Sequence, residues 1–315
     1  MMKYRVGVDI GGTTIKVGVV DENNNIVKRC AVDTPDTFEK SMKALADAVY
    51  ATIGELGLKI EDFPCVGIGT PGSISSETGR LVFSNNTNWK DVPMADELRK
   101  YFPVPVFINN DANCAVMGEA VAGAAKGRKH VIMLTLGTGV GGGIIINGKL
   151  FAGGDGVGAE LGHTVLFHDG YPCTCGIPGC LEAYASATAL IRQTKEAMAA
   201  HPESAMNKWV EENGKVSGRC AFDCAMAGDP VANEVVDTYV SYIANGIGSL
   251  VNVFRPEIVL IGGGISNSGD FLMNKIHAQM PKYTFAYDVV GYPAIERATL
   301  GNDAGIIGAA YSDQM

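Results

Sequence analysis

The chain has 315 residues, of which 47% are hydrophobic, and its formal net charge at pH 7 is −9. This length and apolar content allow a large buried core and two domains, which excludes a disordered or fibrous protein. The negative charge disfavours nucleic acid and anionic membrane surfaces as partners, and no apolar run reaches the 18 or more residues of a membrane span.

The sequence of the first 127 residues predicts strands followed by alternating helices and strands. Three antiparallel strands are expected first, because the β-forming runs KYRVGVDI, IKVGVV and IVKRCAV are separated by the turn sequences GGTT and DENNN. Apolar residues at helical spacing predict a helix over residues 36–56. The following elements are expected to be the strand FPCVGIGT, the short helix MADELRKYF, the strand VPVFINN and the helix DANCAVMGEAVAGAAKG.

The opening pattern then repeats. HVIMLTL, GTGVGG and GIIING again predict strand, turn and strand, which indicates a duplicated lobe. Later elements are expected to be helices near 186–200, 203–212, 217–227 and 230–253, the strand EIVLIGGG, a helix near 269–280, one or two short strands and a helix near 303–313. The chain is therefore predicted to be α/β, with mixed sheets flanked by helices.

Two Gly-Thr turns are candidates for phosphate binding. In DIGGTT, Asp9 ends a strand, two glycines let the backbone approach an anion, and two threonines supply hydroxyls. A tight hairpin chosen only for its backbone geometry is the alternative. The run from Gly137 to Gly142 matches GxGxxG, but a strand follows it, whereas a dinucleotide-binding fingerprint must open a helix.

A third glycine run, Gly262 to Gly264, lies between a predicted strand and a predicted helix. It suits either close approach to an adenosine or an ordinary β-to-α turn. Asp111, in VPVFINNDANCA, also stands where a strand gives way to a helix. Its carboxylate either caps the helix or acts as a general base.

Three cysteines follow a histidine within a short segment. His163, Cys173, Cys175 and Cys180 offer one nitrogen and three sulfurs, which suits a closed tetrahedral zinc site, whereas thiolates disfavour magnesium and calcium. A disulfide would leave an odd thiol. Zinc is expected to be structural and to fix the loop that carries Glu160 and Glu182.

The motifs DIGGTTIKVGVV, NNDANCAVMGE, LGTGVGGGI, GAELGH with CTCGIPGCLE, and IGGGIS resemble, in order and over nearly the whole chain, the ROK family of bacterial sugar kinases. Its glucokinase members are the most similar. The resemblance implies an actin/hexokinase-type fold of two ribonuclease-H-like lobes around a cleft. The N-terminal lobe is expected over residues 1–119 and joined by the C-terminal helix 302–315, and the C-terminal lobe over 120–301, with the zinc loop.

The resemblance also implies transfer of the γ-phosphate of ATP, with Mg²⁺, to a hexose. Glucose is the first choice, and N-acetylmannosamine, N-acetylglucosamine, fructose and allose are the alternatives. A non-catalytic sugar sensor and an actin-fold ATPase or chaperone are the rivals from other classes. Family repressors carry a winged helix before DIGGTT, and because eight residues precede Asp9, we expect no DNA-binding module. A cytoplasmic homodimer or homotetramer is expected.

By resemblance, each site residue has an expected role. Asp111 is the base, and Asp9 reaches the magnesium ion or its water. The residues expected to bind sugar are Gly72, Asn86 (or Asn85 in its place), Asn110, Asp111, Glu160, His163 and Glu182. The residues expected to bind nucleotide are Asp9, Gly11, Gly12, Thr13, Thr14, Lys16, Thr138, Gly139, Gly262, Gly263 and Gly264. Lys16 either joins this group or faces solvent.

Overall fold

The structure, a computed structural model, describes residues 4–75, 78–84 and 87–314. Contacts divide the chain into two compact units, which are described separately below. Unit 1 comprises Met1–Ile132, Gly143–Ala159 and Thr299–Met315, and unit 2 comprises Met133–Gly142 and Glu160–Ala298. The lobe boundaries expected at 119/120 and 301/302 stay a prediction.

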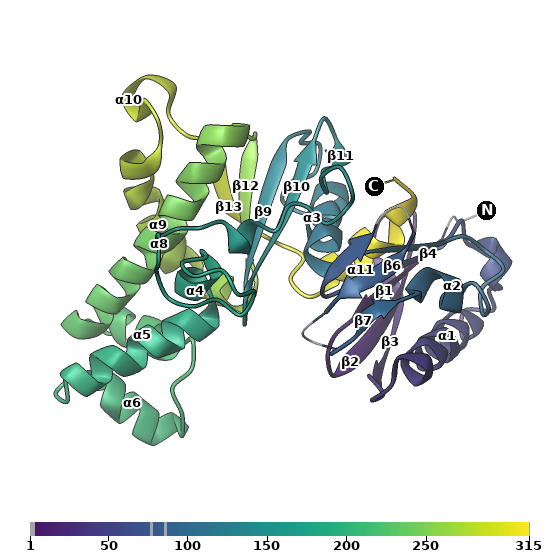
Figure 1. Cartoon of the computed structure of the whole chain (residues 1–315), viewed down its shortest axis with the longest axis horizontal. Helices are drawn as coiled ribbons and strands as arrows, with labels where there is room; N and C mark the ends of the chain where they lie inside the picture. The colour runs from purple at the N-terminus through teal and green to yellow at the C-terminus, as the bar shows by residue number, and fades with distance from the viewer. Residues whose placement is uncertain (1–3, 76–77, 85–86, 315) are drawn as a thin grey trace. The chain divides into compact units, whose positions relative to one another are not determined.

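Unit 1 contains a five-stranded mixed sheet with the order β3-β2-β1-β4-β8 (Figure 1). The first three strands pair antiparallel, as predicted, and β4 and β8 add in parallel. The strands are β1 (Arg5–Ile10), β2 (Thr14–Val20), β3 (Ile26–Asp33), β4 (Val66–Thr70) and β8 (Val106–Asn110). Helix α1 (Phe38–Gly54) contacts β2 and β3, and its buried residues join the core formed by Val6 and Val8.

The other face of this sheet holds the C-terminal helix α11 (Asp303–Ala310) at backbone contact distance. Successive strand residues point to opposite faces, so Gly7 lies between Val6 and Val8 on the α11 side. A Cβ atom at Gly7 would lie 2.0 Å from the Ile306 carbonyl oxygen, and one at Gly67 would lie 1.7 Å from that of Ala309. Glycines in β1 and β4 are therefore what allows α11 to pack here.

Helix α3 (Asp111–Ala122) lies against α11 (Figure 1) and carries a fully buried carboxylate. Glu119 Oε1 accepts hydrogen bonds from the backbone N–H groups of Thr299 at 2.9 Å and Leu300 at 2.7 Å. Its Oε2 accepts from Ala124 N at 2.8 Å. A buried charge needs such partners, and these bonds join α3 to the segment that leads into α11.

A second five-stranded sheet has the order β11-β10-β9-β12-β13. Its strands are β9 (Val131–Leu136), β10 (Val140–Ile146), β11 (Lys149–Leu150), β12 (Ile258–Gly262) and β13 (Ala294–Arg297). The order repeats that of the first sheet, with β9, β10 and β11 corresponding to β1, β2 and β3. The repeat predicted from the two Gly-Thr turns is thus confirmed in the order of the strands.

A small sheet of three short strands was not predicted from the sequence. Its strands pair in the order β5 (Ser73–Ser75), β6 (Arg80–Phe83) and β7 (Lys90–Val92). The short helix expected at MADELRKYF is α2 (Met94–Leu98). Runs of three or four residues carry too little alternation to be distinguished from loop.

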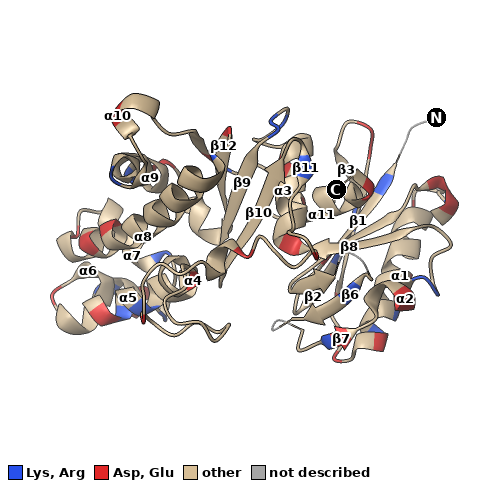
Figure 2. Ribbon diagram, turned by 45° about the horizontal axis from the view of Figure 1, so that its top comes forward, with Lys and Arg blue, Asp and Glu red and all other residues tan. Residues whose placement is uncertain are grey.

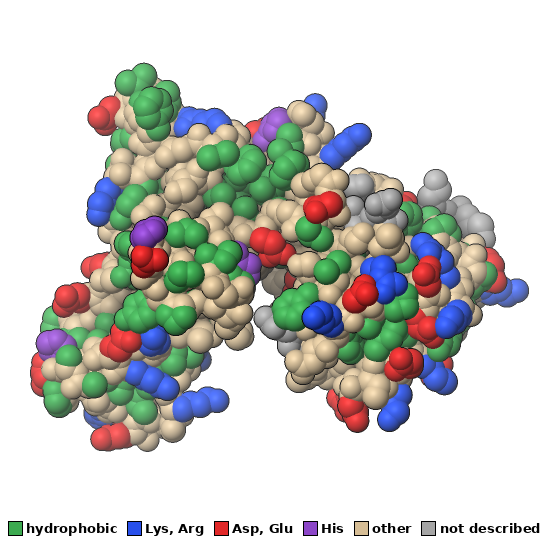
Figure 3. Space-filling model, viewed as in Figure 1, with side chains coloured by type: hydrophobic (Ala, Val, Ile, Leu, Met, Phe, Trp, Pro, Cys, Tyr) green, Lys and Arg blue, Asp and Glu red, His purple; other side chains and the backbone are tan. Residues whose placement is uncertain are grey.

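Unit 2 is rich in helices, and the predicted helices lie where they were expected. They are α5 (Ala187–Ala200), α6 (Ala205–Asn213), α7 (Cys220–Met226), α8 (Pro230–Phe254) and α9 (Gly269–Tyr283). Two short helices, α4 (Glu182–Ala185) and α10 (Tyr287–Val290), were not predicted from the sequence. Apolar side chains gather over α10 (Figure 3), where Phe285, Val289 and Val290 are exposed.

The charged surface of each unit mixes both signs. Basic and acidic residues are both scattered over each unit (Figure 2), and several opposite charges three or four residues apart are paired. Within the described ranges, no helix combines the length and the apolar character needed to cross a membrane.

We predict that Gly67→Ala lowers the free energy of unfolding by about 3 kcal/mol, because the new methyl group meets a backbone carbonyl that cannot move independently. Gly54→Ala is the matched control. Gly54 is the exposed last residue of α1 and has no atom within 4 Å of the added Cβ, so this change is neutral or stabilises by up to ~1 kcal/mol. Urea unfolding of both variants makes the comparison, and equal midpoints would contradict the close packing of α11.

Candidate active site

The β1–β2 turn of unit 1 is tightly closed. Gly11 N donates to Thr14 O at 2.8 Å, and Thr34 holds the turn through its hydroxyl, which donates to Gly11 O at 2.8 Å. The predicted residues Gly12 and Thr13 lie exposed at its tip. Lys16 does not simply face solvent, since its Nζ lies 3.1 Å from Asp9 Oδ2.

The sequence left two roles open for Asp111, helix cap and general base, and the contacts where β8 meets α3 distinguish them. The helix cap is Asn110, whose Oδ1 accepts from Ala112 N at 2.8 Å and Asn113 N at 3.3 Å. Asp111 is the first helical residue, and its Oδ1 also accepts from Ala112 N, at 2.9 Å. Because Asn110 fulfils the capping role, the Asp111 carboxylate is not required as the cap.

Asn110 is also joined to a second predicted sugar-binding residue. Its Nδ2 donates to the Gly72 carbonyl oxygen at 3.0 Å. Gly72 has φ +113°, and a Cβ there would lie 2.2 Å from Phe83 O, so this position requires glycine. Asn86 and Asn85 lie outside the described residues.

The carboxylates of Asp9 and Asp111 both act on the buried thiol of Cys114. Burial raises the pKa of Cys114 well above its ordinary value, and the negative charges of Asp111 and Asp9 raise it further. Interactions of this kind weaken with distance. The predicted base and the predicted magnesium-associated carboxylate of unit 1 therefore act electrostatically on the same buried thiol.

In unit 2, the β9–β10 turn lies beside the third glycine run. Gly137 N donates to Gly139 O at 3.0 Å, and Thr138 is exposed at the tip. Gly263, with φ +80°, approaches the end of β9 so closely that a Cβ would lie 2.4 Å from Leu136 O. Gly263 therefore lies against Leu136, the residue that precedes the 137–140 turn. A short 3-10 helix, Gly264–Ser268, separates this run from α9.

The four predicted metal ligands converge. One nitrogen of His163 and the sulfurs of Cys173, Cys175 and Cys180 all lie within 4.8 Å of one another. His163 Nδ1 is 3.6 Å from Cys173 Sγ, and the sulfurs of Cys175 and Cys180 are also 3.6 Å apart. Tetrahedral zinc with bonds of about 2.0–2.3 Å requires separations of this size, so the ligand set fits zinc.

The three thiols differ in acidity. Desolvation alone would raise the pKa of Cys175, but hydrogen bonds involving the Ile177 backbone and the neighbouring thiols lower it below its ordinary value. Burial raises the pKa of Cys173, and it raises that of Cys180 to about 12. A metal at this site must displace those protons, so its affinity falls as the pH falls.

Glu160 and Glu182 lie next to the metal ligands. Glu160 is exposed as a residue, yet protein atoms desolvate its carboxylate and raise its pKa; the charge on Glu182 acts in the same direction and His163 opposes it. Glu182 Oε1 lies 3.5 Å from Cys173 Sγ. Unit 2 therefore brings Glu160, His163 and Glu182 together.

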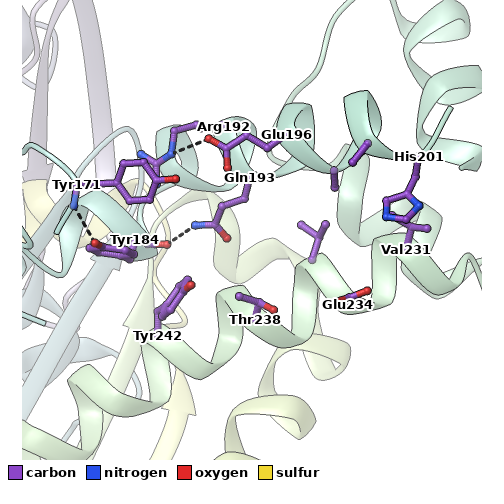
Figure 4. A pocket seen from close by; sticks show the side chains of 13 residues that line it. Tyr171, Tyr184, Arg192, Gln193, Glu196, His201, Val231, Glu234, Thr238 and Tyr242 are labelled. Carbon is purple, nitrogen blue, oxygen red and sulfur yellow. Dashed lines mark hydrogen bonds and ion pairs between the residues drawn. The ribbon is translucent and has the colours of Figure 1, made fainter. Parts of the chain in front are cut away.

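A cluster of aromatic rings supports the start of the metal-binding loop (Figure 4). Tyr171 N donates to the Tyr184 hydroxyl at 2.8 Å, and the Arg192 guanidinium lies over the Tyr171 ring, 3.9 Å from its centroid. Gln193 Nε2 donates to Tyr184 O at 2.9 Å. These residues line one end of a cavity of about 320 Å³ that extends along α5 and α8 to His201. None of the predicted site residues within the described ranges lines it.

Two residues that hold the β9–β10 turn in place were not predicted from the sequence. Thr188 donates its hydroxyl to the Thr138 carbonyl oxygen at 2.8 Å, and Ala187 N donates to Gly137 O at 2.8 Å. A helix start after Ser186 is readable from the sequence, but nothing in it indicates that the first turn of α5 contacts a loop fifty residues earlier.

These features define an α/β protein of the actin/hexokinase class. They are the repeated strand order, a Gly-Thr turn in each unit, and a Cys₃His cluster beside two carboxylates. The ROK family profile matches residues 5–313, and the chain belongs to the ROK family. Glucokinase from Thermotoga maritima is 42% identical over 314 residues, which cover 97% of this chain and 95% of that protein.

Two solved structures share the fold. A ROK family glucokinase from Streptomyces griseus, in complex with glucose and AMPPNP, has a TM-score of 0.83 and 36% identity, with 98% of each chain covered. A ROK hexokinase from Thermus thermophilus has a TM-score of 0.83 and 34% identity, with 98% of this chain and 97% of that chain covered.

We predict that purified wild-type protein contains about one zinc per chain and that Cys175→Ser contains almost none, because a serine hydroxyl cannot replace a thiolate ligand. Cys30→Ser is the matched control, since Cys30 is a free thiol of β3. Elemental analysis after dialysis measures the metal. A Cys175→Ser protein that retained zinc at the wild-type level would contradict the ligand set.

Proposed function

We propose that the protein is an ATP-dependent kinase that transfers the γ-phosphate of ATP to a hydroxyl of glucose. The observation that carries the proposal is that Asn110 caps α3, so that the carboxylate of Asp111, the first residue of this helix, is left for the role of base. Similarity to glucokinases over almost the whole chain supports glucose as the substrate.

In this reaction, the sugar hydroxyl oxygen forms a bond to the γ-phosphorus while the bond from that phosphorus to the β–γ bridging oxygen breaks. The hydroxyl proton passes to the Asp111 carboxylate, and ADP leaves with the bridging oxygen. Phosphoryl transfer needs little covalent help, so the protein contributes mainly position and charge. A base in this role contributes roughly 10²–10⁴ in rate.

We propose that both Gly-Thr turns contact phosphate through backbone N–H groups and threonine hydroxyls. Mg²⁺, when bound, neutralises charge on the phosphates, and Asp9 is the residue proposed to hold it or one of its waters. Lys16, whose Nζ lies 3.1 Å from Asp9 Oδ2, is the residue proposed to add positive charge beside the phosphates.

We propose sugar-binding residues within each unit. In unit 1, Asn110 and Gly72 are joined by a hydrogen bond, so each orients the other. In unit 2, Glu160 and Glu182 flank the proposed zinc loop, and His163 directs Nδ1 toward Cys173. We propose that its second nitrogen contacts the sugar and that zinc supplies rigidity to this loop.

We predict that Asp111→Asn lowers kcat by at least about 10² while glucose affinity stays within about tenfold, because the amide keeps the shape but cannot take a proton. Asp303→Asn is the matched control: Asp303 is also the first residue of a helix, and its ion pair with Arg29 is exposed. Steady-state kinetics and calorimetry measure both. Turnover of Asp111→Asn above roughly a hundredth of wild type would remove Asp111 as the base.

We also predict that turnover requires added Mg²⁺, because charge in the loose transition state exceeds what the two turns neutralise. Protein freed of loosely bound ions by gel filtration, with its zinc content verified, is assayed with sodium ATP and glucose. Activity is expected only after magnesium is returned. Full activity without any added divalent ion would contradict the role given to the metal.

A further inference from the structure

The 137–140 turn is fixed by a single short segment of unit 2, residues 182–188. Ala187 N donates to Gly137 O and the Thr188 hydroxyl donates to Thr138 O, both at 2.8 Å. The third bond runs the other way, from Val140 N to Glu182 Oε2, at 3.0 Å. Three backbone groups of the turn, on Gly137, Thr138 and Val140, are therefore held by the segment that follows the metal ligand Cys180.

Glu182 contacts the metal-binding loop with its other oxygen. Its Oε1 lies 3.3 Å from Thr174 Oγ1 and 3.5 Å from Cys173 Sγ. A thiolate bound to zinc has no proton to donate, so the Thr174 hydroxyl is then the donor that remains. The approach to the turn is close, since a Cβ at Gly139 would lie 2.3 Å from Glu182 Oε2. One carboxylate thus bonds to the loop and to the turn.

These bonds determine where the turn directs its donors. In a trans peptide unit, the C=O of one residue and the N–H of the next point in opposite directions. The carbonyls of Gly137 and Thr138 point into the 182–188 segment, so the N–H groups of Thr138 and Gly139 point away from it. Successive N–H groups with one direction form an anion-binding concavity.

We propose that Glu182 and Thr188 are positioning residues for the nucleotide, and that Glu182 therefore acts on both substrates. The inference rests on the proposed function, in which Glu182 contacts glucose and the 137–140 turn contacts phosphate. Thr188, by contrast, acts on the nucleotide alone.

Calorimetry with a non-hydrolysable ATP analogue and, separately, with glucose tests this proposal. Thr188→Val removes one hydrogen bond at constant shape and weakens nucleotide binding about threefold to tenfold, with glucose binding unchanged. Glu182→Ala weakens binding of both ligands. Glu182→Gln restores nucleotide affinity, because an amide oxygen accepts from Val140 N–H, but it does not restore glucose affinity.

Thr238→Val is the matched control, since Thr238 is an exposed threonine of α8 that lines the cavity of Figure 4. It leaves both affinities unchanged. If the Thr188→Val variant binds nucleotide as tightly as the wild type, the inference is overturned while the proposed function stands. This variant decides the question even if Glu182→Ala fails to fold. A wild-type protein that binds neither ligand overturns the proposed function itself.

Discussion

The backbone contact between α11 and its glycine-bearing neighbours is the constraint on which unit 1 depends. Gly7 and Gly67 admit the helix to the sheet, and Gly308 of α11 admits α3, since a Cβ at Gly308 would lie 1.7 Å from Cys114 O. Packing at this distance leaves no freedom for one element to slide along another. Because Asp9 lies one residue before the end of β1 and Asp111 begins α3, the same contact fixes both carboxylates. The last helix of the chain thus sets the geometry of residues near its beginning.

Unit 2 reaches comparable precision by polar means. Glu160 and the three cysteines of its site lie outside the strands and helices, in loops that are ordinarily more mobile. Hydrogen bonds from the 182–188 segment and the four convergent metal ligands replace the close backbone packing of unit 1. Rings of Tyr171 and Tyr184 with the Arg192 guanidinium hold the entrance of the loop. The two units share a strand order but hold their site residues in place by different interactions.

Much of this architecture was predictable because the strands and helices have strong apolar periodicity. The hairpins around the Gly-Thr turns, the strand order repeat and the convergence of His163 with its cysteines follow from local sequence and spacing. The small sheet of β5 to β7 did not, because strands this short carry no distinctive pattern.

Side-chain partners were the harder part of the site. NNDAN offers adjacent residues able to cap a helix, and only the structure shows that Asn110 does so. The pairing of Lys16 with Asp9 across the β1–β2 hairpin follows from strand register, which places these two residues opposite each other. Thr188 could not be found from the sequence, because its partner depends on tertiary packing.

The thiols of this chain differ in their reactivity toward reagents in solution. Burial keeps Cys65, Cys114 and Cys220 protonated, with the pKa of Cys65 raised to about 11 and that of Cys220 to about 12. Cys175 combines exposure with a lowered pKa, the two properties that favour attack by oxidants and alkylating reagents. Coordination by zinc would occupy that sulfur, so the metal would shield the most vulnerable thiol in addition to ordering the loop.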